Sequence, residues 1–255
     1  MNNNKYFSLK RFSRLLKKEA HINIKRDLLI IVAMYSLYTI VMALVFEFGE
    51  GDYSKEVIEN LHFVTFTVMF FTAGYFITSF SFIELRDKMK SHFYLLTPGS
   101  NFEKFTVNLF ISFIAYILFM IISYYLYSQT FNWLVFKIYN IQFSPLDLLS
   151  DEFGIVINIF IIAHSIFLLG SLSFKKFPIL FTPIACVVII IILSFYNELV
   201  EKIVFAGMDI NDKISDLDFN NFFARYKLFA KAISFYVFPI ILWFTAYIKL
   251  NEKEY

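Results

Sequence analysis

The stretch Leu28-Leu-Ile-Ile-Val-Ala-Met-Tyr-Ser-Leu-Tyr-Thr-Ile-Val-Met-Ala-Leu-Val-Phe46 is uncharged and long enough to cross the hydrocarbon core of a membrane as one helix. The 27 residues before it are polar and basic. The stretch is longer than a signal-peptide core and lacks a small-residue cleavage site, which favours an uncleaved first span. The chain is therefore expected to be an integral membrane protein.

The same kind of run recurs along the chain. Of the 255 residues, 58% are hydrophobic and 17% are charged, and the apolar residues are not spaced as in a soluble amphipathic helix. Six runs are long enough to be spans, and they cover residues 28–48, 61–82, 105–127, 153–174, 178–196 and 232–248. These runs predict an all-α integral membrane protein with six transmembrane helices in a single domain, residues 1–255.

The distribution of lysine and arginine predicts how these spans are oriented. If the N-terminus is cytoplasmic, the inner segments hold 16 of the 23 Lys and Arg residues, and the net charge is +9 inside and −7 outside. Because cytoplasmic loops carry the excess of basic residues, both termini are expected in the cytoplasm. The overall net charge of only +2 indicates no nucleic-acid partner.

An amphipathic pattern precedes the first span. Leu9, Phe12, Leu15 and Leu16 share one face at helical spacing. The opposite face is basic and comprises Lys10, Arg11, Arg14, Lys17 and Lys18. Such a helix is expected to lie in the membrane interface, with its basic face toward anionic lipid or an acidic partner. A basic tail that contacts lipid alone is the alternative.

The loop between the second and third spans, residues 83–104, is predicted to be ordered. Residues 84–92 are expected to continue the second span as a short charged helix. Thr97-Pro98-Gly99 then indicates a turn. Ser100 followed by Glu103 matches a capping box that opens the third span.

Two outer segments carry further signals. Ser144-Pro145-x-Asp147 resembles the capped start of a short interfacial helix. Residues 197–231 are too long for a simple hairpin loop and contain apolar stretches, so we expect them to be partly helical and partly embedded in the membrane.

The spans contain little chemistry. No carboxylate or cation lies in mid-membrane, which counts against an ion-coupled transporter. We interpret His164, the one deep histidine, as hydrogen-bonded to a neighbouring helix, with a proton relay or ligand contact as the alternative. Thr67, Gly74 and Thr78 recur at helical spacing and indicate either helix packing or a partly polar conduit.

Several functions are excluded by missing motifs. No glycine is followed by lysine, so the sequence has no phosphate-binding loop and predicts no ATPase activity or other enzymatic function of its own. The single cysteine excludes a cysteine zinc site within one chain. The acidic residues between 209 and 218 lack the spacing of a calcium loop, so no metal or cofactor is predicted.

Two stretches resemble a known family. One is Leu95-Leu-Thr-Pro-Gly-Ser-Asn-Phe-Glu-Lys-Phe105, in the loop after the second span. The other is Leu168-Leu-Gly-Ser-Leu-Ser-Phe-Lys-Lys-Phe177, in the hairpin between spans four and five. Each is similar to the corresponding segment in the permease subunits of type-2 ATP-binding-cassette (ABC) exporters. The topology, with an amphipathic N-terminal helix before six spans, resembles the same family.

The resemblance implies a location, two partners and a docking surface. It implies a multi-pass protein of the bacterial cytoplasmic (inner) membrane that pairs with a second permease subunit, as a homodimer or heterodimer, around a substrate conduit. It also implies a separate ATP-binding subunit, which would hold ATP and Mg. The loop residues that would dock on this subunit are Arg86, Asp87, Lys88, Lys90, His92, Thr97, Pro98, Gly99 and Ser100.

Two alternatives remain at this point. The charged loop residues could form an ordinary solvated cytoplasmic loop. The chain as a whole could be a non-transport membrane protein used for anchoring, assembly or immunity, because a fold does not define a function.

Overall fold

The computed structural model describes residues 6–48, 55–139, 150–204 and 233–254, and all the elements in these ranges are helical. In chain order they are α1 (Leu9–Phe48), α2 (Lys55–Ser79), η1 (Ile83–Arg86), α3 (Lys88–Leu96), α4 (Asn101–Leu109), η2 (Phe110–Ala115), α5 (Tyr116–Tyr139), α6 (Asp151–Ser173), α7 (Pro178–Val204), η3 (Ile233–Val237), α9 (Phe238–Asn251) and η4 (Glu252–Glu254). Here η1 and η4 are 3-10 helices, whereas η2 and η3 are π-helices.

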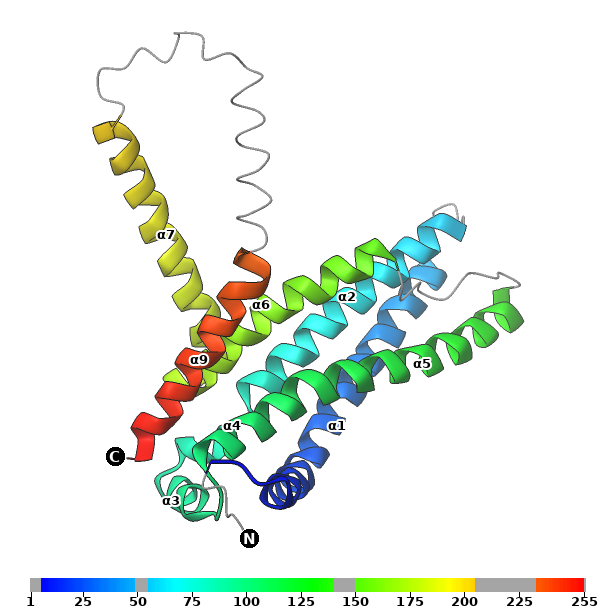
Figure 1. Cartoon of the computed structure of the whole chain (residues 1–255). Helices are drawn as coiled ribbons and strands as arrows, with labels where there is room; N and C mark the ends of the chain where they lie inside the picture. The colour runs from blue at the N-terminus through cyan, green and yellow to red at the C-terminus, as the bar shows by residue number, and fades with distance from the viewer. Residues whose placement is uncertain (1–5, 49–54, 140–149, 205–232, 255) are drawn as a thin grey trace.

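Five of the described helices are long and apolar enough to cross a membrane. A sixth apolar helix, Phe235–Asn251, is shorter. The architecture therefore fits an α-helical membrane protein, in which α1, α2, α5 and α6 run along one another in a bundle (Figure 1). The predicted all-α class is confirmed.

The N-terminal amphipathic segment is not a separate helix. It is continuous with the first span in α1, whose 40 residues bend so that the first turns run across the end of the bundle (Figure 1). Leu15, Glu19 and Asn23 are buried there, so this segment packs on the protein itself. The expectation of a distinct helix before the span was wrong in this respect.

The loop between the second and third spans also differs from expectation. The helix of the second span does not continue into residues 84–92, because α2 ends at Ser79 and a turn and η1 follow. Asp87 then starts a new helix, α3, by accepting hydrogen bonds from the backbone N–H groups of Met89 and Lys90. Helix α3 is therefore separate from α2.

The predicted start of the third span is confirmed. Ser100 accepts from the Glu103 N–H, and the Glu103 carboxylate accepts from the Ser100 N–H, which completes the capping box of α4. From Asn101 the helical path continues through the π-turn η2 to Tyr139, well beyond the predicted 105–127.

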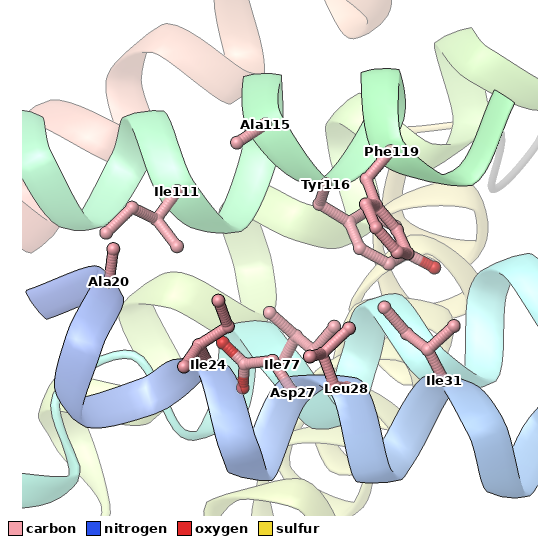
Figure 2. Close-up of a pocket in the computed structure, with 10 residues that line it drawn as sticks. All are labelled: Ala20, Ile24, Asp27, Leu28, Ile31, Ile77, Ile111, Ala115, Tyr116 and Phe119. Atoms are coloured by element: carbon pink, nitrogen blue, oxygen red, sulfur yellow. The ribbon is translucent and has the colours of Figure 1, made fainter. Parts of the chain in front are cut away.

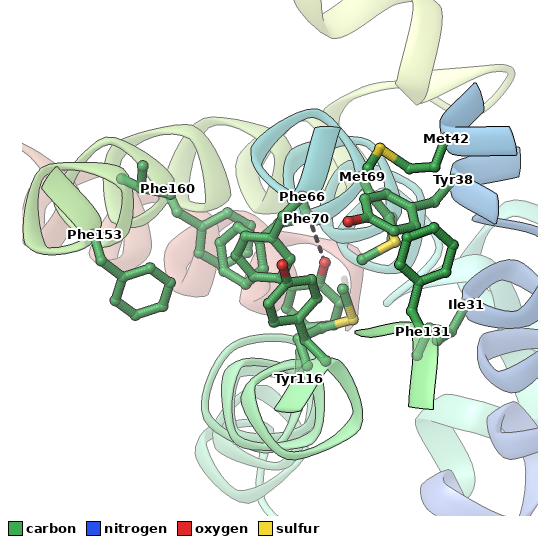
Figure 3. Packing of buried hydrophobic residues seen from close by; sticks show 14 of the residues in the cluster. Ile31, Tyr38, Met42, Phe66, Met69, Phe70, Tyr116, Phe131, Phe153 and Phe160 are labelled. Carbon is green, nitrogen blue, oxygen red and sulfur yellow. Dashed lines mark hydrogen bonds between the residues drawn. The ribbon is translucent and has the colours of Figure 1, made fainter. Parts of the chain in front are cut away.

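An aromatic core joins the helices of the bundle (Figure 3). Phe66 and Phe70 of α2, Tyr116 and Tyr124 of α5 and Phe160 of α6 are fully or almost fully buried in it. Gly74 lies beside the Phe160 ring, which occupies the space of a Cβ at this position. This glycine therefore allows α2 and α6 to approach closely.

Helix α7 stands apart from the other helices over most of its length (Figure 1). Near its start it contacts α6, where Thr182 lies against Gly170. Farther along, its large apolar side chains from Leu180 to Leu199 are mostly exposed. Helix α7 extends to Val204, so the predicted outer segment 197–231 begins as a helix. Residues 205–231 of that segment lie outside the described residues, and so does the predicted interfacial helix start at Ser144-Pro145-x-Asp147.

Candidate functional site

The described residues predicted to lie in the cytoplasm form a compact assembly at one end of the bundle. It contains the first turns of α1, the loop with η1 and α3, the start of α4 and the end of α9 (Figure 1). The apolar side chains of this assembly pack with α6 in a hydrophobic cluster separate from the aromatic core. The cluster includes Phe82, Tyr94, Phe105, Leu168 and Leu250.

Glu103 joins the N-terminus to this assembly. Its side chain is 0% exposed, and it accepts hydrogen bonds from the Ser8 N–H at 2.6 Å and the Arg11 Nε at 3.0 and 3.1 Å. A second Arg11 nitrogen lies 3.0 Å from the carboxylate. Ser100 adds a further link by donating to the Tyr6 carbonyl at 2.6 Å. One carboxylate thus caps α4 and holds the start of α1, two segments more than 90 residues apart.

Two arginines close the C-terminal end of α2. Arg86 donates to the Ser79 carbonyl and Arg26 donates to the Phe80 carbonyl at 3.2 Å. Both guanidinium groups also lie over the Phe80 ring, at 5.3 and 5.4 Å from its centroid. The last carbonyls of a helix have no partner within the helix, so cations at this end supply the missing donors.

The turn after α3 is held by two lysines around Tyr94. Lys18 donates to the Thr97 hydroxyl at 3.3 Å, Lys104 donates to the Leu95 carbonyl at 2.8 Å, and each ammonium group lies 5.6 Å from the Tyr94 ring centroid. Lys18 also pairs with Glu84 at 3.8 Å. The loop is consequently fixed at its start, its turn and its end.

The outer face of α3 is apolar. Met89, Phe93 and Leu96 are 71%, 67% and 68% exposed and follow one another at spacings of four and three, so they form one stripe along the helix. Sequence reasoning missed this stripe because it considered the charges of the segment. The i, i+4, i+7 spacing of the three residues was the signal that could have found it.

The residues predicted to dock on a partner fall into two groups. Asp87, Lys88, Lys90, His92 and Pro98 are exposed on or near α3. Arg86, Thr97, Gly99 and Ser100 make internal contacts and shape the loop. Arg86 is half-buried, and this burial together with the nearby Arg26 lowers the pKa of its guanidinium. The expectation that Arg86 is a surface charge was therefore wrong.

The basic face predicted for the N-terminal segment is divided in the same way. Lys10, Arg14 and Lys17 are exposed, whereas Arg11 and Lys18 are half-buried in the contacts described above. Two of the five cations therefore hold the assembly together.

His164 lies at the centre of the bundle and is fully buried. It forms a hydrogen bond with the Ser112 hydroxyl at 3.0 Å and accepts one from Trp243 Nε1 at 3.3 Å. It is thus bonded to two neighbouring helices, as interpreted from the sequence. Thr78 is also fully buried, and Thr67 is half-buried; both lie on α2 with Gly74. Among the described residues these two threonine hydroxyls have no hydrogen-bond partner.

A cavity of about 200 Å³ lies between α1, α2 and the π-turn η2 with the start of α5 (Figure 2). Its walls are apolar apart from the Asp27 carboxylate and the Tyr116 hydroxyl. Asp27 pairs with Arg26 at 2.8 Å, so its charge is compensated. Within the described ranges, no cluster of three His, Cys, Asp or Glu side chains could hold a metal ion.

Comparison of the chain with protein-family models, with curated proteins and with solved structures finds no match. The fold and the site define the class of protein: an α-helical, multi-pass membrane protein with an ordered assembly at one end of its bundle.

Proposed function

We propose that this protein is the membrane-spanning permease subunit of an ABC exporter, and that α3 docks on a separate ATP-binding subunit. The observation that carries the proposal is the apolar stripe of Met89, Phe93 and Leu96 on a short helix fixed at both ends. An exposed apolar stripe flanked by Lys88, Lys90 and His92 is typical of a surface that binds another protein.

Rigidity of the loop supports a role in transmitting force. Asp87 caps α3, Lys18 and Lys104 hold its C-terminal turn, and Glu103 joins the following helix to α1. A displacement of α3 would then reach α1, α2 and α4 together, because hydrogen bonds join the loop to each of these helices. ATP hydrolysis in the partner would move the spans in this way.

The proposed class of ABC exporter permease also implies a membrane topology and a second partner. Six spans would place both termini in the cytoplasm of a bacterium, in its inner membrane, with α9 and its preceding π-turn as the sixth span. A second permease subunit would pair with this one around the conduit, and the exposed apolar side chains of α7 offer it a contact surface. ATP and Mg would be bound by the ATP-binding subunit alone.

The test is a triple substitution, Met89→Ser, Phe93→Ser and Leu96→Ser. After affinity purification of the full-length chain from its native membranes, the triple variant should retain less than about a tenth of the co-purifying ABC-type ATPase activity, because loss of apolar contacts at an interface core costs about 1.4 kcal/mol or more. The measurement is vanadate-sensitive phosphate release, together with identification of the ATP-binding subunit by mass spectrometry.

The matched control is Leu9→Ser, which removes an equally exposed apolar side chain at the same end of the molecule but outside α3. Leu9→Ser should leave the co-purifying activity unchanged. Absence of any ATP-binding subunit from the unaltered protein would favour the anchoring, assembly or immunity alternative. An unchanged complex with the triple variant would show that α3 is not the docking surface.

A further inference from the structure

A second cavity, of about 290 Å³, lies beside α3 on the side of α9 and the α6–α7 turn. It is formed by three segments far apart in sequence: the loop from η1 through α3, the turn after α6 and the C-terminal end. Its lining comprises Leu85, Arg86, Lys88, Ser91, His92, Leu95, Lys175 and Lys253. Four permanent cations therefore surround one small space.

These cations have no carboxylate partners in the part of the chain that the structure describes. None of its ion pairs involves Arg86, Lys88, Lys175 or Lys253. Two acidic residues of the same loop are engaged elsewhere: Asp87 caps α3, and Glu84 pairs with Lys18. Within the described residues, no carboxylate therefore lies in ion-pair contact with these four cations.

The effect of this crowding is visible in Lys253. Burial lowers the pKa of its ammonium group, and the neighbouring charges of Lys249, Lys175 and Arg86 lower it further. Like charges at short range destabilise one another, and a bound anion would remove this cost. The backbone places Lys175 here through a tight turn, in which Phe177 has a φ of 45° that few non-glycine residues adopt.

We propose that this cavity binds a phosphate group. Lys88, Lys175 and Lys253, the Arg86 guanidinium and the Ser91 hydroxyl line the cavity and offer the charge-assisted and neutral hydrogen-bond donors that phosphate oxygens accept. The volume is at the lower end of the range of ligand pockets, which suits a single phosphate headgroup rather than a large ligand. A phosphomonoester lipid headgroup and free phosphate share this chemistry.

The site also has a consequence for the fold. A bound phosphate would connect three elements that line the cavity, namely the loop with α3, the α6–α7 turn and the C-terminal η4. Phosphate binding would therefore tie the end of the chain to the loop that follows the second span. This inference does not depend on an ATP-binding partner.

The experiment uses the purified full-length chain and two probes. Inorganic phosphate is titrated into the detergent-solubilised protein by calorimetry. Retention of phosphatidate is measured by native mass spectrometry after release from nanodiscs of phosphatidylcholine with and without phosphatidate. The test variant is Lys175→Gln with Lys253→Gln, and the control is Lys176→Gln with Lys10→Gln, which removes the same charge at exposed sites outside the cavity.

Whichever probe the unaltered chain binds, the test variant should bind it at least about tenfold more weakly, because two charge-assisted contacts are lost. The control should stay within about twofold of the unaltered chain. Binding of both probes identifies a site open to free phosphate, and binding of phosphatidate alone identifies a lipid-headgroup site. The proposal is overturned if neither probe binds, or if the test variant and the control bind both probes equally. If the double variant fails to fold, the single variant Lys253→Gln is measured with the same probes and should also bind more weakly than the control.

Discussion

At the scale of single residues, Glu103 combines several structural roles. It completes the capping box with Ser100 and binds Ser8 and Arg11 while fully buried. A buried acceptor with several donors is costly to remove, since every donor then loses its partner. The order of the N-terminal segment is thus expected to depend on this one side chain.

Glu103→Ala should release the first turns of α1 and destabilise the fold by about 1–3 kcal/mol, the usual cost of leaving buried polar groups unsatisfied. Limited trypsin digestion should then cleave faster at Lys10, Arg11 and Arg14, with a lower melting temperature in detergent. Glu252→Ala, at an exposed position near the C-terminus, is the control. Equal digestion rates for the two variants would show that Glu103 does not anchor this segment.

Gly74 and Gly154 form a natural pair for testing helix packing. Gly74→Ala should lower stability by about 1–3 kcal/mol, because its Cβ would overlap the Phe160 ring in a filled core. Gly154→Ala meets no atom within 4 Å and should raise stability by up to about 1 kcal/mol through helix propensity. Thermal unfolding of both variants measures this, and a stability loss at Gly154 as large as at Gly74 would contradict the packing argument.

At the scale of elements, the π-turn η2 sets the register of the helix that crosses the bundle. On one side Ser112 reaches His164, and on the other Ile111 and Ala115 line the apolar cavity between α1 and α2 (Figure 2). Immediately after it, Tyr116 donates to the Phe70 carbonyl. One additional residue in the turn brings both sets of contacts into place.

Insertion of one alanine after Ile114 adds a residue that the already widened π-turn cannot absorb, so it should rotate the following helix by about 100° relative to the preceding one. Tyr116 would then lose its bond to α2, and a marked fall in melting temperature is expected. Ile114→Ala keeps the residue count and removes only a partly exposed side chain, so it should have little effect. An insertion variant as stable as this substitution would show that η2 does not set the register.

The sequence was sufficient for elements whose signals are local. The capping box at Ser100 depends on neighbouring residues and is confirmed. The apolar runs depend on hydrophobicity, and five of the six predicted spans coincide with helices long and apolar enough to cross a membrane. The break after α2 was missed because Arg26, which binds the Phe80 carbonyl, lies 54 residues away. In the candidate site, the turn from Thr97 to Gly99 was predictable, whereas the internal role of Arg86 required the tertiary contacts.

At the scale of the whole molecule, the orientation in the membrane remains a prediction from the distribution of charge. Asp151 is the first residue of α6, and Lys176 lies just after its last residue, Ser173. Both side chains are exposed, so they mark the two ends of one helix. In a Cys186→Ser background, an impermeant thiol reagent should label Asp151→Cys in intact cells and Lys176→Cys only after permeabilisation. Labelling of position 176 from outside intact cells would reverse the topology.

The isolation of α7 has a consequence for the way the chain is made. The side chains of His164, Ser165 and Ser171 on α6 are buried. The earlier helices and α9 shield these polar groups from lipid. The apolar surface of α7 needs no such partners. Because only a short turn separates the two helices, α6 and α7 can enter the bilayer together as a hairpin, and the hydrogen bond from Trp243 to His164 forms once α9 has been synthesised.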